Sequence, residues 1–119
     1  KELIFRDKIG RDRHDRRKRV VDFKNGQYAE THVTRLKQFQ NKTSLVRCRL
    51  KTGRTHQIRV HLSHVGFPLA GDDLYGGHLD YIRRQALHAG YLAFTHPMTQ
   101  EYIELRAPMP TDMKDLLYL

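Results

Sequence analysis

The sequence has a single cysteine and no long apolar segment. Cys48 alone cannot form an internal disulfide, so the cysteine content gives no indication of an oxidising compartment. The alternating stretch "SLVRCRL" predicts that this cysteine is a small core residue. No stretch has the length of a membrane span or the pattern of a secretory signal. We therefore expect a cytoplasmic protein with no membrane partner.

Acidic residues are scarce relative to basic ones. Of the 119 residues, 13 are Asp or Glu and 22 are Lys or Arg, which gives a formal net charge of +9. The hydrophobic fraction of 39% is ordinary for one globular domain and excludes a disordered chain. The charge imbalance indicates a polyanionic partner, with nucleic acid the first candidate.

The pattern of elements predicts an α+β fold with a mainly antiparallel or mixed sheet and few short helices. A strand is expected in "ELIFRD", followed by a basic loop over residues 7–19 and a short strand "VVDF" that leads into an Asn-Gly hairpin turn. Alternation predicts further strands over residues 28–39, 43–50, 86–97 and 101–108. The last segment, 112–119, is expected to be a short closing helix. The chain begins at Lys1 within a strand-like stretch, so we expect a fragment of a longer polypeptide.

The stretch "GRTHQIR", residues 53–59, is the most polar helix entrance in the sequence. Helical spacing of apolar residues predicts a helix over 55–65, with Thr55 as N-cap and Gly66 just beyond the C-terminus. Arg54 and Thr55 would then face an incoming anion together with free backbone N–H groups. Arg59 lies one turn further in, where a partly buried guanidinium needs an anionic partner. Spacing alone leaves open that these arginines are only a solvated helix face.

The basic run "RDRHDRRKR" is the second electrostatic feature. Asp12 and Asp15 reduce the net positive charge of this run, which is compatible with a solvated loop. The overall excess of cations in the chain nevertheless favours phosphate contacts along a nucleic-acid backbone.

Other kinds of chemistry find little support in the sequence. His61 and His64 share a helix face but have no cysteine or carboxylate at ligand spacing, so no metal site is expected. No serine lies in a nucleophile turn, and Cys48 has no base beside it. Asp72 and Asp73 occupy a glycine-flanked turn, where aspartate commonly hydrogen-bonds its own backbone.

The segment "LKTGRTHQIRVHLSHVGFPLAGDDLYGG", with "RQALHAGYLAFTHP" and "IELRAPMP" after it, closely resembles the C-terminal half of the catalytic domain of RluA-type RNA pseudouridine synthases. The likeness continues upstream through "GQYAETHVTRLKQF" and covers nearly the whole chain. It implies that residues 1–119 are part of a single catalytic domain, with rRNA or tRNA as the partner.

The resemblance also implies a reaction that needs no cofactor. In this family the glycosidic bond to N1 of uridine is broken, the uracil rotates, and the ring is rejoined through C5. An aspartate in an H-R-L-D motif does the covalent work, and a buried arginine of the G-R-T-H-Q-I-R helix pairs with it. By position that arginine is Arg59. RNA contacts are expected from two basic or polar stretches: Arg16, Arg17, Lys18 and Arg19, and Arg54, Thr55, His56 and Gln57.

One departure from the family pattern is large. No H-R-L-D string occurs in the 119 residues, so the nucleophile-bearing half of the domain is expected to be absent and the chain alone to be inactive. Without that half we expect Arg59 to be exposed or paired elsewhere, and the chain either to self-associate through a bare sheet edge or to be marginally stable. The alternative function is a non-catalytic RNA-binding module. A helix-turn-helix built on residues 55–65 is disfavoured because strands surround that helix.

Overall fold

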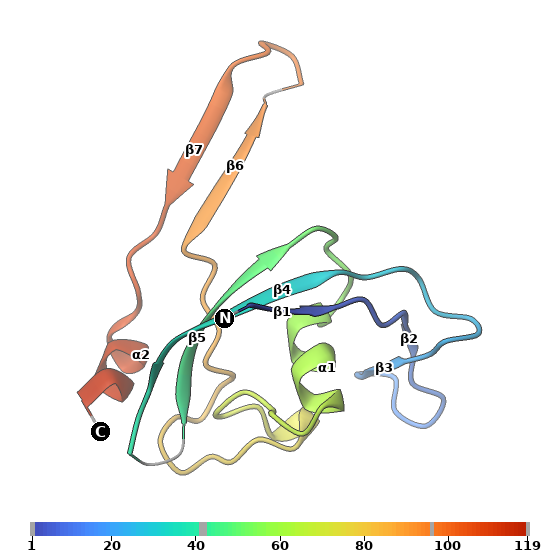
Figure 1. Ribbon diagram of the computed structural model, residues 1–119, viewed down its shortest axis with the longest axis vertical. Coiled ribbons are helices and arrows are strands. Elements are labelled where there is room, and N and C mark those ends of the chain that lie inside the picture. Colours follow the sequence, from blue (N-terminus) through green and yellow to red (C-terminus); the bar gives the residue numbers. More distant parts are fainter. Residues whose placement is uncertain (1, 41–42, 96, 119) are drawn as a thin grey trace.

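The computed structural model describes residues 2–40, 43–95 and 97–118 of the chain. A three-stranded antiparallel sheet forms its largest layer (Figure 1), in the order β1-β4-β5. Its strands are β1 (Glu2–Phe5), β4 (Thr31–Gln38) and β5 (Ser44–Leu50). The strands expected in these three segments are therefore confirmed. The first residues of β4 are buried, whereas its last four are exposed.

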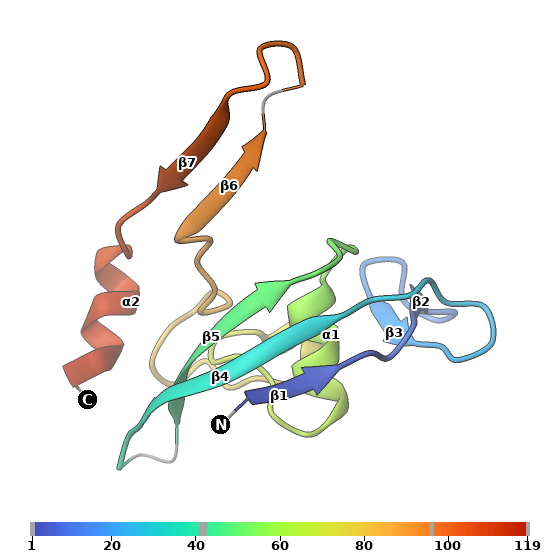
Figure 2. The same cartoon turned by 45° about the horizontal axis from the view of Figure 1, so that its top comes forward.

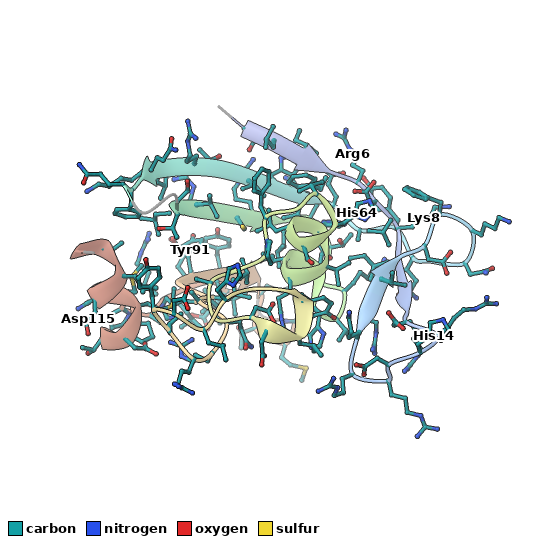
Figure 3. All side chains as sticks on the ribbon, turned by 90° about the horizontal axis from the view of Figure 1, so that it is seen from below. Arg6, Lys8, His14, His64, Tyr91 and Asp115 are labelled. Carbon is teal, nitrogen blue, oxygen red and sulfur yellow. The ribbon has the colours of Figure 1, made fainter. Side chains whose placement is uncertain are left out.

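The expected basic loop over residues 7–19 is partly wrong, because it contains most of a small hairpin. Strand β2 (Ile9–Arg11) pairs antiparallel with β3 (Arg19–Val21), so only the residues between them form a turn. The apolar side chain of Ile9 is buried in the core and Val21 packs against it, which anchors the hairpin despite its charge. Figure 3 shows His14, in this turn, at the opposite end of the molecule from Asp115 on the closing helix.

The Asn-Gly turn is present but does not join two paired strands as predicted. The N–H of Gly26 donates to the carbonyl of Asp22, which closes the turn. The chain then returns along β2, where Gln27 exchanges two backbone hydrogen bonds with Ile9. Strand β2 therefore lies between β3 and Gln27, because its second edge attracts the returning segment.

Helix α1 (Gln57–His64) packs against β3 and β4, and Figure 2 shows it behind the three-stranded sheet. Its C-terminus is as predicted: Gly66 has a φ of 89°, and the N–H groups of Gly66 and Phe67 donate to the carbonyls of Ser63 and Leu62. The N-terminus of α1 differs from the prediction. His56 is the N-cap residue in place of Thr55, with a left-handed φ of 57° and no side-chain capping bond.

The C-terminal third extends away from this body. After the 3₁₀ turn η1 (Asp73–Tyr75) comes an antiparallel hairpin that projects in Figures 1 and 2. It consists of β6 (Tyr91–Thr95) and β7 (Tyr102–Arg106) and is followed by α2 (Thr111–Asp115) and η2 (Leu116–Tyr118). The expected strand pair and closing helix are confirmed. None of the described helices is long and apolar enough to cross a membrane.

The core is small and partly polar. Ile9, Ala29, Val60 and Tyr75 form its buried apolar cluster. Beside it, the side chains of three polar residues are buried and mutually hydrogen-bonded: Thr31, Gln57 and His61. The α+β class with small antiparallel sheets and few helices is thus confirmed.

At Gly71, next to η1, the backbone of another segment comes very close. A Cβ on Gly71 would lie 2.0 Å from the carbonyl oxygen of Arg84, and its φ is +76°. Gly66 has a similarly positive φ of +89°, but its Cβ would meet nothing within 4 Å. We expect Gly66→Ala to cost about 1–2 kcal/mol of unfolding free energy through backbone strain alone. Gly71→Ala should cost roughly 1–3 kcal/mol more, because backbone must move as well. Equal urea midpoints for the two variants would contradict this packing.

Candidate active site

The centre of the site is an ion pair between α1 and the turn before η1. Arg59 Nε donates to Asp72 Oδ2 at 2.9 Å, and Arg59 Nη2 donates to Asp72 Oδ1 at 2.8 Å. The side chains are 12% and 1% exposed, respectively. Two parallel bonds of this kind fix the plane of the guanidinium. The prediction that Arg59 is partly buried and needs a carboxylate is confirmed, and within the described residues that carboxylate is Asp72.

The prediction for Asp72 is correspondingly wrong. Its side chain does not hydrogen-bond its own backbone; only its backbone carbonyl closes the turn, accepting N–H groups from Tyr75 and Gly77. The signal that could have identified it is the buried cation itself, which requires an anion, together with the glycines that shape this turn. Asp73, the neighbouring aspartate, is exposed.

Tyr75 connects the ion pair to the helix entrance and to the hairpin. The Arg59 guanidinium carbon lies 5.0 Å from the centre of the Tyr75 ring, and Lys18 Nζ lies 5.5 Å from it. The Tyr75 hydroxyl accepts the backbone N–H of Arg19 at 2.9 Å and is hydrogen-bonded to His56 Nδ1 at 2.7 Å. Burial raises the pKa of Tyr75, which keeps the phenol neutral. Because cations stack on its ring, Tyr75 helps to hold Arg59 in place.

His56 is a half-buried member of the same cluster. Its pKa is lowered, chiefly by burial and then by the positive charges of Arg59 and Arg19. The ring is therefore neutral at physiological pH and can share a proton with the Tyr75 hydroxyl without adding charge to the site. His56, which was expected to touch RNA, thus lies in the Arg59 cluster through its bond to Tyr75.

Gln57 was expected to contact RNA, and the structure contradicts this. Its side chain is 3% exposed and its amide is fully used inside the protein. Nε2 donates to the carbonyl of Glu30 and to Thr31 Oγ1, while Oε1 accepts from Thr52 Oγ1 and from the N–H of Arg54. The glutamine thus fastens the helix entrance to β4 and leaves no group for a ligand.

The other predicted RNA contacts separate into three environments. Arg16 is exposed, whereas Arg17 is paired with Asp15 at 2.8 Å. Lys18 and Arg19 turn toward Tyr75, as described above. At the helix entrance, Arg54 Nε donates to the carbonyl of Tyr28 at 2.8 Å, and Thr55 is exposed. The structure therefore brings the end of the basic run and the helix entrance together through Tyr75.

Comparisons with known proteins identify the family of the chain. A family model described as RNA pseudouridylate synthase matches residues 1–64. The uncharacterized RNA pseudouridine synthase YlyB of Bacillus subtilis is 53% identical over 111 residues, which are 92% of this chain and 36% of YlyB. Ribosomal large subunit pseudouridine synthase D of Buchnera aphidicola is 47% identical over 111 residues, covering 79% of this chain and 35% of that protein.

A solved structure shares the fold. Human RNA Pseudouridylate Synthase Domain Containing 1 superposes with a TM-score of 0.75 at 31% identity, covering 90% of this chain and 48% of that one. The chain spans about a third of the length of the curated relatives it matches.

Proposed function

Because the chain belongs to the RNA pseudouridine synthase family, we propose that it supplies one half of an active site that isomerises uridine to pseudouridine in structured RNA. The proposed substrate is rRNA, which the name of the Buchnera relative supports, with tRNA as the alternative. Residues 1–119 are, in this proposal, the C-terminal part of a single catalytic domain that acts in the cytoplasm. The single observation that carries the proposal is the fixed, partly buried guanidinium of Arg59.

Arg59 retains donors for a second anion. A guanidinium has five N–H groups, and Asp72 occupies one on Nε and one on Nη2. No hydrogen bond joins Nη1 to any residue within 2–40, 43–95 and 97–118. Those N–H groups can hold an incoming carboxylate in its ionised, nucleophilic form and stabilise negative charge that develops on the uracil.

The nucleophilic aspartate is proposed to come from a polypeptide segment outside these 119 residues, since the sequence contains no H-R-L-D string. The chain alone is then inactive. Asp72 does not replace the nucleophile, because its carboxylate is buried and both of its oxygens are bound to Arg59. We also propose that the chain can self-associate through an edge of the three-stranded sheet, where β1 and β5 are the outer strands.

The test is isomerisation of RNA carrying tritium at C5 of uridine. Forming the bond between C5 and the ribose displaces the C5 hydrogen to solvent, while N1 takes up a proton, so tritium release reports the reaction. We expect none from the chain alone and release when a polypeptide carrying the H-R-L-D segment is added. Substituting the aspartate of that segment by asparagine is the control and should abolish the release.

Two outcomes would overturn this function. Release by the chain alone would place the nucleophile within the 119 residues. Binding of RNA without release from the complete mixture would instead support the alternative, a non-catalytic RNA-binding module. That alternative is favoured by one observation, namely the number of arginines near the helix entrance that have no carboxylate partner.

A further inference from the structure

A hollow lies between the β2–β3 hairpin and the residues that precede α1. Its volume is about 580 Å³, and both the hairpin and the helix entrance contribute to its wall. Four guanidinium side chains line it: Arg11, Arg13, Arg19 and Arg54. Two of these, Arg11 and Arg13, belong to the basic run "RDRHDRRKR", for which phosphate contacts were expected. We call this hollow the arginine groove.

The arginine groove has an uncompensated positive charge. Among the described residues, Asp22 is the only carboxylate that lines it, so four cations and one anion leave an excess of three. Asp22 is engaged by its own turn, where Oδ1 accepts the N–H groups of Asn25 and Lys24. These bonds, with that from Asn25 first, lower the pKa of Asp22, and the charge of Arg13 adds to the same shift. Asp22 therefore stays ionised but offsets only part of the arginine charge.

None of the groove arginines has a close acidic partner among the described residues. Among the described residues, no carboxylate oxygen lies within 4.0 Å of a groove guanidinium, whereas six arginines elsewhere have one: Arg6, Arg17, Arg49, Arg59, Arg84 and Arg106. Four like charges facing one hollow repel one another, and no described carboxylate lies within 4.0 Å to offset this repulsion. Their arrangement is explained by an anion that arrives from outside.

We propose that the arginine groove binds consecutive phosphates of the RNA backbone and thereby delivers the target nucleotide to the Arg59 site. The inference rests on the proposed RNA substrate. Guanidinium groups match phosphate oxygens with two parallel N–H bonds, and a concave wall presents several of them at once. The groove adjoins the site directly, because the backbone N–H of Arg19, a groove residue, donates to the Tyr75 hydroxyl.

Non-charged groups in the groove suit the ribose and base edges of the same strand. Asn25 and Gln27 are exposed and line the groove with amides, and Thr55 adds a hydroxyl. These groups can donate and accept, as a strand of RNA with 2′-hydroxyls requires. The groove is therefore assigned to a nucleic-acid strand rather than to an isolated phosphate ion.

The experiment compares two double variants that remove the same charge. Arg11→Gln with Arg13→Gln empties half of the groove; both side chains are exposed and make no hydrogen bond to described residues, so the fold should be unaffected. Arg47→Gln with Arg83→Gln is the matched control, since both are exposed and neither lines the groove. Binding of a short fluorescent oligouridylate RNA is measured between about 50 and 200 mM salt.

For single strands, the slope of log affinity against log salt is about 0.7 per neutralised phosphate. We therefore expect the groove variant to reduce the wild-type slope by about 1.4 and the control variant to leave it unchanged. An equal decrease of this slope in both variants would contradict the proposed role of the groove, because the net charge alone would then explain RNA binding. Complete displacement of the RNA by inorganic phosphate would overturn it as well, since the site would then recognise an isolated ion.

Failure of the groove can be told apart from failure of the proposed function. If the groove variant binds RNA and releases tritium as the wild type does, the proposed role of the groove is wrong, but the proposed isomerase function stands. No RNA binding by the wild-type chain, together with no tritium release by the complete mixture, would overturn both.

Discussion

Replacing Asp72 with asparagine is expected to lower the free energy of unfolding by about 3–5 kcal/mol, the usual cost of breaking a buried ion pair on one side. The carboxylate is 1% exposed and accepts both bonds from Arg59. An asparagine retains the shape but leaves a guanidinium that is largely shielded from water without its counter-charge. Urea denaturation followed by circular dichroism measures the loss.

The matched control for this prediction is Asp73→Asn. It removes the same charge from the adjacent residue, which is exposed, and should change stability by no more than about 0.5 kcal/mol. If the two variants unfold at the same urea concentration, the Arg59–Asp72 pair does not stabilise the fold and the site has been misinterpreted.

Replacing Arg59 with lysine is expected to slow isomerisation by roughly 10²–10³-fold in the mixture that contains the H-R-L-D segment, the usual cost of losing one positioned donor group. Lysine keeps the charge but cannot form the two parallel bonds that orient the guanidinium on Asp72. Affinity for RNA should remain near the wild-type value, because Arg59 does not line the arginine groove.

Two measurements separate this effect from a general loss of structure. Thermal melting shows whether the lysine variant is folded at the assay temperature, and the RNA affinity shows whether its surface is intact. A variant that is folded and binds RNA but releases tritium at the wild-type rate would exclude Arg59 from the chemistry. A variant that loses affinity and rate together would place Arg59 in binding instead.

Regular elements were predicted where local patterns and packing agree. Alternation over residues 28–39 and 43–50 predicts β4 and β5, which pair with each other as neighbouring antiparallel strands. The end of α1 follows from Gly66, which adopts a backbone conformation that most residues avoid. The resemblance to the family added the assignment of Arg59, which spacing alone had left open.

The β2–β3 hairpin could not be predicted from the same patterns. Charged residues surround Ile9 so densely that the segment has no strand periodicity, yet this one side chain is buried and anchors the pairing. Burial of a single residue depends on what packs against it, here Val60 and Ala29 from distant segments. Local sequence does not contain that information.

Polar residues at the helix entrance were misassigned for a related reason. Gln57 and His61 have side chains that normally face water, and the apolar residues at helical spacing were expected to face the core instead. The structure buries both polar side chains, because Thr31, Thr52 and backbone carbonyls satisfy every polar group of Gln57 and both ring nitrogens of His61. Val65, an apolar residue of the predicted helix 55–65, is exposed. Such networks become visible only when distant partners are placed.

The central claim is that Arg59, held by Asp72, acts on a carboxylate that the 119 residues do not contain. A double-mutant cycle on tritium release tests it most directly, combining Arg59→Lys in this chain with Asp→Asn in the H-R-L-D segment. If the two groups act as one unit, losing either one already removes their joint contribution to the rate. The double variant should therefore release tritium no more slowly than the slower single variant. Losses that multiply would show that Arg59 and that aspartate act independently, and would contradict the account.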